Sequence, residues 1–403
     1  PPGEYELNVH FQNTEPVRRK VKVLQGRASP MNIVWSPVVV GETQVIETQN
    51  TGLTRPDSAQ SGVVLGAASQ SKIASGRSYQ NLTQQAAGVS GGANPNVKGG
   101  NALMNRYLVD GLDITDPVTN TFSANINFDS IASLELLTGG MEAQYNSLGS
   151  VINLISSAGS DSFHADASVY GNHYKLSAPA QYGSTVNDGF RPFNTTIRPP
   201  TQGYQANLNV SGPIVSQRLW YNVSLEYRNA TASVPLGPPL NVQAPNRESN
   251  VYLARAKLTW APTSKHRLLL SGLADPATFD YVDNNGGRAN AWTPLASRRQ
   301  NQGGALGTAI WEYSVTDTVQ TQVQAGFQYS SLDNGPQGKL GKIDEGKYGK
   351  YDYNRPRHDN LDDGSAWYNA PSDSQDRRYT YQLDFSLSKR GELLGRHDLK
   401  TGI

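Results

Sequence analysis

The chain has 403 residues, of which 37% are hydrophobic, and it contains 39 glycines, 20 tyrosines and no cysteine. The lack of cysteine excludes disulfides, thiolate metal sites and a cysteine nucleophile within this sequence, and the near balance of 35 basic and 34 acidic residues gives no electrostatic argument for binding nucleic acid. No apolar stretch approaches the ~18 residues that a membrane helix needs. A composition this rich in glycine, tyrosine and small polar residues also disfavours helical bundles.

The first strongly patterned part of the chain is a glycine-rich segment between two apolar runs. These runs, Leu134–Leu137 and Val151–Ile155, are each short enough for a strand. Between them, Gly139, Gly140 and Gly149 permit tight turns where backbones pass close to one another. We expect two buried strands of a small mixed sheet.

Beyond residue 160 the pattern changes to alternation of apolar and polar side chains. In residues 219–228 the leucines, tyrosines and valines occupy one face, and asparagine, serine, glutamate and arginine occupy the other. The same alternation appears in residues 204–211, 319–329 and 379–387. This period of two predicts strands. About nine such segments follow one another, each near the ~10 residues of a membrane-spanning strand.

The connections between these segments alternate in length. Ala261–His266 and Ser314–Thr318 are short turns. The long polar connections are Leu176–Gln202, Asp275–Gly304 and Ser331–Arg377. Aromatic residues recur at strand ends, where an interfacial girdle would lie; they are Tyr204, Trp220, Tyr221, Trp260, Trp311, Tyr313, Tyr329 and Tyr379. Alternation alone also fits a soluble sandwich with an apolar core, but strand length, loop asymmetry and the aromatic positions favour an outer-membrane barrel.

Three motifs in order carry a resemblance to a known family. They are "NRYLVDGLDITDP" (Asn105–Pro117), "INFDSIASLELLTGG" (Ile126–Gly140) and "AQYNSLGSVINLISSAGSDSFHADASVYG" (Ala143–Gly171). Together they resemble the plug domain of TonB-dependent outer-membrane transporters running into the first barrel strand. The resemblance implies a plug motif at Tyr107, Asp110, Gly111, Glu135, Gly139, Gly140, Tyr145, Gly149 and Asn153. We expect Asp110 and Gly111 to form a turn.

Two departures from the family pattern matter. Thr138, Gly139 and Gly140 stand where siderophore transporters carry arginine, glycine and proline, so the arginine that locks plug to barrel is absent and a ferric-siderophore substrate is doubtful. Ser150 replaces the second glycine before "VIN".

The resemblance covers nearly the whole chain and is strongest to the Oar-like branch of the family. It implies a mainly β fold in four parts. These are the end of a carboxypeptidase-regulatory-like β-sandwich (1–36), a TonB-box region and linker (37–62), a mixed α/β plug domain (63–160) and the first strands of a transmembrane barrel (161–403). Because a complete barrel of this type has about 22 strands, we expect the chain to be an incomplete portion of a longer protein.

The segment where the family places its TonB box contains three β-branched residues beside a polar linker. The predicted TonB contact is Pro37, Val38, Val39, Val40, Gly41 and Glu42. An extended, unpaired segment of this kind can pair with a strand of a partner protein. The alternative is that Val38–Val40 closes the preceding sandwich.

The function that the resemblance implies is active transport across the bacterial outer membrane, with the plug gated by the proton-motive force. The implied partners are TonB, ExbB and ExbD indirectly, outer-membrane lipid, and an unknown substrate that could be a peptide or protein. The alternatives are an adhesion or binding protein of the cell surface, and a TonB-coupled exporter. We expect no enzyme activity, cofactor or nucleic-acid partner.

Single residues with metal-binding or acid-base potential do not form known motifs. The six histidines lack a close metal spacing. The acidic loop Arg357–Ser365 lacks the ligand spacing of an EF-hand, and the adjacent carboxylates Asp362 and Asp363 do not by themselves make an acid-base site. We expect strand and solvated loop residues at these positions.

Overall fold

Strands dominate the computed structural model of the chain. It describes residues 3–9, 17–23, 61–66, 77–141, 143–176, 201–232, 246–283, 294–316, 318–341, 372–392 and 396–403, with short pieces between 343 and 370. Among these residues, no helix is both long enough and apolar enough to cross a bilayer.

The N-terminal strands β1 (Gly3–Val9) and β2 (Val17–Val23) form an antiparallel pair. The predicted TonB contact at residues 37–42 lies outside the described residues. The next described element is β3 (Ser61–Gly66), the first strand of the small sheet.

The small sheet has five strands in the order β3-β8-β9-β6-β7, and we call residues 61–160 the plug. Its other strands are β6 (Arg106–Val109), β7 (Leu112–Asp113), β8 (Ile131–Gly139) and β9 (Val151–Ser156). The sheet is mixed, because β6 and β9 are parallel whereas the other pairs are antiparallel. The two apolar runs predicted as strands are therefore confirmed as parts of β8 and β9.

Short elements complete the plug and pack around its core. They are helix α2 (Tyr79–Thr83), the strand pair β4 (Val89–Ser90) and β5 (Asn96–Val97), and the 3-10 turns η1 (Ala102–Met104), η2 (Phe128–Ser130) and η3 (Ala143–Tyr145). Fully buried apolar side chains from α2, β6, β8 and β9 form one cluster, including Leu82, Tyr107, Leu134 and Ile152. Two buried leucines from outside the plug, Leu273 and Leu306, also belong to this cluster; both lie in the ten-stranded sheet described next.

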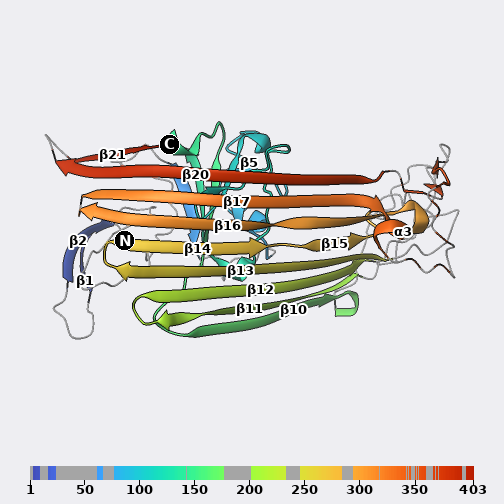
Figure 1. Ribbon diagram of the computed structural model, residues 1–403, viewed down its shortest axis with the longest axis horizontal. Helices are drawn as coiled ribbons and strands as arrows, with labels where there is room; N and C mark the ends of the chain where they lie inside the picture. Colours follow the sequence, from blue (N-terminus) through green and yellow to red (C-terminus); the bar gives the residue numbers. More distant parts are fainter. Residues whose placement is uncertain are drawn as a thin grey trace.

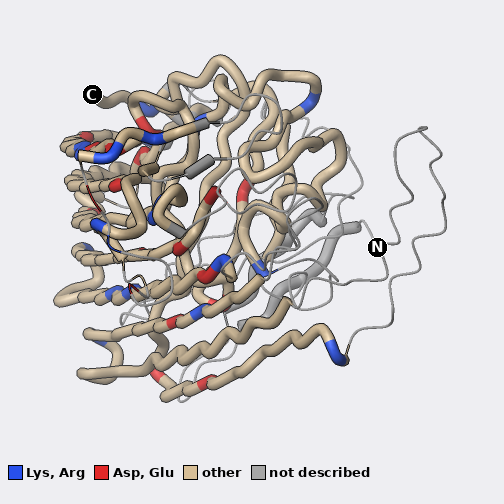
Figure 2. The backbone as a smooth tube through the Cα atoms, turned by 90° about the vertical axis from the view of Figure 1, so that its right-hand side faces the viewer, with Lys and Arg blue, Asp and Glu red and all other residues tan. Residues whose placement is uncertain are grey.

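A ten-stranded sheet, which we call the barrel sheet, contains most of the described residues after the plug. Its strands are β10 (His164–His173), β11 (Thr201–Val215), β12 (Leu219–Ala232), β13 (Arg247–Thr263), β14 (His266–Ala274), β15 (Ala277–Asp280), β16 (Arg298–Thr316), β17 (Val319–Pro336), β20 (Ser374–Glu392) and β21 (Arg396–Gly402). Each strand pairs antiparallel with its neighbours. Figures 1 and 2 show the sheet curving around one side of the plug.

Small elements lie in the connections at one end of the barrel sheet. They are η4 (Tyr174–Leu176), η5 (Pro294–Ala296), α3 (Gln337–Leu340), β18 (His358–Asp359) and β19 (Ala366–Trp367). The opposite end carries the short turns after Thr263 and Thr316. Figure 1 shows α3 at the end away from the turn between β13 and β14.

Six of the ten barrel strands are longer than the expected ~10 residues: β11, β12, β13 and β17 span 14–18, and β16 and β20 each span 19. Two predicted connections were therefore too long. β15 and the start of β16 occupy part of Asp275–Gly304, while β17 continues to Pro336 and β20 begins at Ser374. Apolar-polar alternation marks only the part of a strand with one apolar face, whereas backbone pairing continues through the polar residues beyond it.

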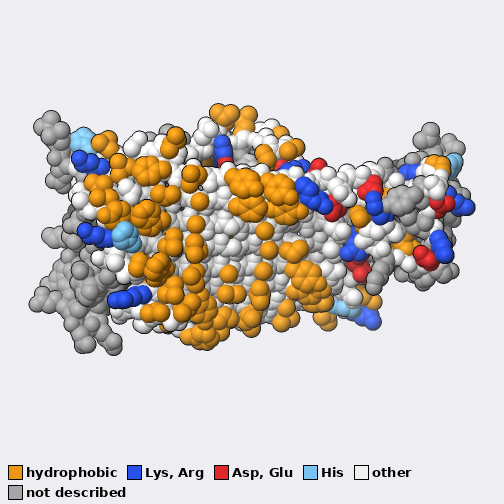
Figure 3. All heavy atoms as spheres, in the orientation of Figure 1, with side chains coloured by type: hydrophobic (Ala, Val, Ile, Leu, Met, Phe, Trp, Pro, Cys, Tyr) orange, Lys and Arg blue, Asp and Glu red, His pale blue; other side chains and the backbone are white. Residues whose placement is uncertain are grey.

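The two faces of the barrel sheet have opposite chemistry. On β13, Tyr252 and Trp260 are 52% and 45% exposed, whereas Arg255 and Lys257, on the alternate face, are 4% and 7% exposed. The exposed face is thus apolar and the buried face, toward the plug, is polar. A soluble sandwich requires the reverse, so the structure rules out that alternative for the barrel sheet. Figure 3 shows the hydrophobic side chains as a broad band across the strands.

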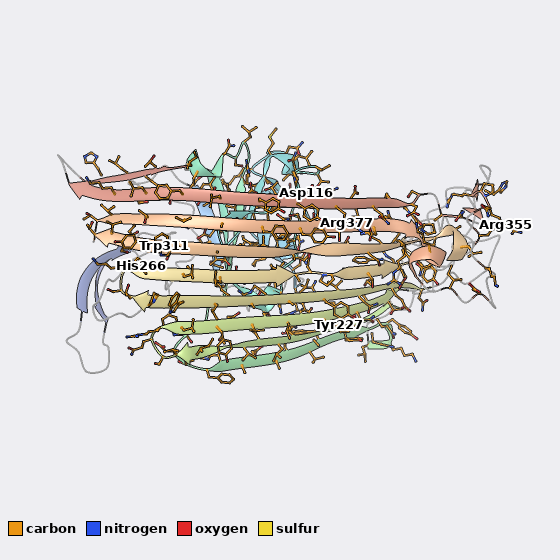
Figure 4. All side chains as sticks on the ribbon, viewed as in Figure 1. Asp116, Tyr227, His266, Trp311, Arg355 and Arg377 are labelled. Atoms are coloured by element: carbon orange, nitrogen blue, oxygen red, sulfur yellow. The ribbon has the colours of Figure 1, made fainter. Side chains whose placement is uncertain are left out.

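Aromatic residues border this band on both sides. His266, Trp311 and Tyr313 stack near the short turns, with ring centroids 4.4–5.9 Å apart, while the Tyr227 and Tyr252 rings lie 4.9 Å apart further along the sheet. Figure 4 shows Trp311 and Tyr227 well separated along the strands. Eight residues separate Tyr252 from Trp260 on β13, or about 27 Å at ~3.4 Å per residue, which matches the ~25 Å apolar band of an outer-membrane barrel.

Trp220 was wrongly predicted to belong to the girdle. Its side chain is 4% exposed, on the buried face of β12, and its Nε1 donates to Asp161 Oδ1 at 2.8 Å. It shares the sequence parity of Asn222 and Ser224, which also face the plug. Trp220 therefore fastens the segment that leads from the plug into β10.

Candidate functional site at the plug–barrel interface

The turn between β6 and β7 projects from the plug toward the barrel sheet. Asp110 and Gly111 form this two-residue turn, with φ angles of 50° and 83°. Both angles lie in the left-handed region, as a tight turn between antiparallel strands requires, and Asp-Gly is a favoured pair for it. The turn places the Asp110 carboxylate at the plug surface.

The Asp110 carboxylate forms a buried ion pair with Lys257 of β13. Lys257 Nζ lies 3.1 Å from Asp110 Oδ1, and the two side chains are 6% and 8% exposed. Ser156 completes the site: its backbone N–H donates to Asp110 Oδ1 at 2.9 Å, its hydroxyl donates to Oδ2 at 2.5 Å, and its carbonyl accepts from Lys257 Nζ at 3.3 Å. Because both charges are removed from water, losing either partner would leave the other uncompensated.

Arg255 adds a second buried cation two residues away on the same face of β13. Its Nη2 donates to the Ser157 carbonyl at 2.9 Å and also contacts Asn222 Oδ1 on β12. Thus β13 holds the end of β9 through two cationic side chains. Asp110 was predicted from the motif, but neither cation was, because their proximity to the plug depends on the fold.

Further polar contacts join the plug to other strands. Asn127 Nδ2 donates to Ser224 Oγ at 2.8 Å. The Asn125 backbone N–H and side chain donate to Asp275 Oδ2 at 2.7 and 3.1 Å. Each contact pairs a buried polar atom with a partner across the interface, so the plug is attached without unpaired groups at these points.

A second charged contact involves Asp116. Arg378 Nη1 of β20 donates to Asp116 Oδ2 at 2.6 Å, and the carboxylate also accepts the N–H groups of Val118 and Thr119. Burial by itself would raise the pKa of Asp116, but these N–H donors and the Arg378 guanidinium together lower the pKa below its ordinary value. Asp116 is therefore ionised at neutral pH and available to hold Arg378.

Arg77, near the N-terminal end of the plug, contacts the barrel sheet. Its guanidinium forms an ion pair with Asp129 and lies 3.9 Å from the ring centroid of Tyr170 on β10. Its carbonyl accepts from Arg228 Nη2 of β12 at 3.1 Å. Cation–π contact and hydrogen bonding thus connect this segment to two barrel strands.

The other predicted plug residues lie within the plug. Tyr107 is fully buried in its core, and Asn153 Nδ2 donates to Glu135 Oε2 at 3.0 Å. A Cβ at Gly149 would approach the Met104 carbonyl oxygen to 2.8 Å, so only glycine fits there without displacement. Gly139 and Gly140 are at the end of β8, and Tyr145 packs beside Leu108 and Val151. Among the predicted residues, Asp110 is the one for which the structure shows an ion pair with the barrel sheet.

The expected absence of the family's locking arginine has a counterpart in these contacts. At Lys257 and Arg378 the barrel sheet supplies the cation, and the plug supplies the carboxylates of Asp110 and Asp116. In both of these ion pairs the carboxylate belongs to the plug and the cation to the barrel sheet.

Known proteins with a similar sequence indicate the family that this chain resembles. No family model matches the chain. The TonB-dependent transporter Oar of Myxococcus xanthus is 26% identical over 237 residues, which are 55% of this chain and 22% of Oar. The resemblance to TonB-dependent transporters is confirmed. The chain thus spans about a fifth of the length of this curated relative.

Solved structures support the same fold. The outer-membrane transporter YddB from Escherichia coli superposes with a TM-score of 0.65 at 10% identity, covering 87% of this chain and 49% of YddB. The siderophore receptor PirA from Acinetobacter baumannii gives 0.59 at 14% identity, covering 85% of this chain and 47% of PirA. The predicted fold class, a mixed plug with part of a large antiparallel barrel, is confirmed.

Proposed function

We propose that the whole protein is a TonB-dependent transporter of the bacterial outer membrane, in which the plug blocks the barrel and TonB displaces it. The buried Asp110–Lys257 ion pair is the observation that carries this proposal. Together with a few other charged contacts, this ion pair attaches the plug to the polar face of the barrel sheet. Such an attachment is strong at rest and can be broken locally by force, as a gate requires.

The proposed orientation follows from the connections of the barrel sheet. The short turns after Thr263 and Thr316 face the periplasm, and the longer connections around η5, α3 and β18 face the exterior. Outer-membrane barrels have this asymmetry. In this orientation, TonB acts from the end of the barrel that carries the short turns.

In this proposal TonB pulls on residues 37–42, and β3 is the first described strand of the plug that the pull reaches. This strand is the edge of the five-stranded sheet and pairs only with β8 among the described strands. If TonB pairs with an extended segment that precedes β3, its pulling force acts first on β3 and on the pairing of β3 with β8. The charged contacts at Arg77, Asp110 and Asp116 then resist displacement of the plug body. We propose that energy from the inner membrane, delivered through ExbB, ExbD and TonB, breaks these contacts.

We predict that Val39→Pro abolishes TonB coupling. Proline removes the backbone N–H that a pairing strand would use, whereas Val39→Ala keeps it and serves as the control. Binding of the purified C-terminal domain of TonB to the full-length protein should fall to background with Val39→Pro and stay near the parent level with Val39→Ala. Undiminished binding by the proline variant would place the TonB contact elsewhere, whereas a variant that fails to assemble would show that Val38–Val40 belongs to the preceding sandwich.

A further inference from the structure

Arg267 lies on the buried face of the barrel sheet, closer to the short turns than the Asp110–Lys257 pair. It is the second residue of β14 and follows the turn from β13. Lys257 pairs in register with Ser271, so Arg267 stands four residues nearer the turn, or about 14 Å along the strand at ~3.4 Å per residue.

Arg267 has unused hydrogen-bonding capacity. Its Nη1 lies 3.5 Å from Glu312 Oε2, a longer separation than the 3.1 Å of the Asp110–Lys257 pair. Its Nε is buried and has no hydrogen-bond partner among the residues that the structure describes. Within the same set of residues, the Oγ1 of Thr259, on the same face of neighbouring β13, is likewise buried and unpartnered. A buried donor without a partner is costly, so the Arg267 Nε and the Thr259 hydroxyl favour an incoming acceptor such as a carboxylate. The Arg267 side chain as a whole is 32% exposed.

We propose that Arg267 is a second binding position for the Asp110 carboxylate, occupied when the plug is pulled toward the short turns. This inference rests on the proposed orientation and on the proposed pull by TonB. The Asp110 turn leaves Lys257, moves along β13 and β14, and then forms an ion pair with the guanidinium of Arg267. Thr259 Oγ1 donates a further hydrogen bond to the carboxylate.

A second cation along the path would stabilise the displaced plug. The Asp110 carboxylate and Lys257 are 8% and 6% exposed, and a carboxylate that leaves such a partner carries an uncompensated charge, which is costly until it meets another cation or water. A second cation further along the path stabilises the displaced plug and gives it a defined half-released state. Lys257 then governs how readily the plug leaves its resting position, and Arg267 governs how long it stays displaced.

Mechanical pulling on the purified full-length protein in lipid bilayers tests this inference. A tether attached at residues 37–42 supplies the force, so the result does not depend on TonB binding. The parent should pause in an intermediate after an extension of about 14 Å. Arg267→Gln should shorten the lifetime of that intermediate by roughly tenfold or more, since a buried carboxylate loses a charged partner. Arg267→Lys, which keeps the cation, should retain most of it.

Glu312→Gln separates the proposed role from a structural one. It removes the resting partner of Arg267, and the proposal expects an intermediate at least as long-lived as in the parent. An equal loss in Glu312→Gln and Arg267→Gln would show that Arg267 acts only through Glu312, and a parent without the intermediate would also overturn the proposal. Failure of TonB to bind the parent would instead overturn the proposed function and leave the pulling result unaffected.

Discussion

Lys257→Met should weaken the attachment of the plug by about 3–5 kcal/mol, because it leaves the Asp110 carboxylate buried without its cation. The urea concentration at which the plug becomes sensitive to protease in the purified full-length protein measures the change. The double variant Lys257→Met with Asp110→Asn should recover most of the loss, since neither site then holds an unpaired charge.

Lys265→Met is the matched control for this change. Lys265 is an exposed lysine in the turn that joins β13 to β14, so its removal should change the stability of the attachment by less than about 1 kcal/mol. Equal midpoints for Lys257→Met and Lys265→Met would contradict a locking role for the buried pair.

Leu225→Arg should hinder assembly in the outer membrane, at a cost of about 2–4 kcal/mol if the site is near the bilayer midplane. Leu225 is 46% exposed on the apolar face of β12, where lipid would contact it. The fraction of protein that migrates as a folded barrel without boiling, measured in isolated outer membranes, should fall accordingly.

The control for this prediction is an arginine on the polar face. Gln320→Arg suits the purpose, because Gln320 is exposed beside the groove between the plug and strands β17 and β20. Gln324 has the same parity but is only 6% exposed and lies against the plug turn at Gly111, so an arginine there would also disturb the plug. Equal loss of folded protein in Leu225→Arg and Gln320→Arg would indicate a wrong assignment of the faces.

Alternation in the sequence was sufficient to predict the faces of the barrel strands, because a residue's parity decides which side of a strand it occupies. The error at Trp220 arose from reading an aromatic residue as a girdle residue without applying the parity of its own strand. Strand ends were also missed, since polar segments beyond the apolar band carry no alternating signal. The lengths of the connections were overestimated for that reason.

Of the candidate site, only the plug residue Asp110 could be predicted from the sequence. The family motif and the Asp-Gly turn indicate Asp110, but Lys257 lies 147 residues later and looks like any lysine in an alternating strand. Its role depends on the register that places β13 beside the end of β9. Similarly, Arg378 and Asp116 are separated by 262 residues. Long-range packing, rather than local pattern, creates these pairs.

Accessibility of a cysteine at position 224 tests most directly whether TonB moves the plug away from the barrel wall. Ser224 is fully buried and accepts a hydrogen bond from Asn127 Nδ2 of the plug, and these 403 residues contain no cysteine of their own. In intact cells that express Ser224→Cys in the full-length protein, a membrane-impermeant maleimide should label it when TonB is active and leave it unlabelled when TonB is deleted. A cysteine at the exposed Asn354 should react in both strains. Equal labelling of the cysteine at 224 with and without TonB would contradict a TonB-gated plug.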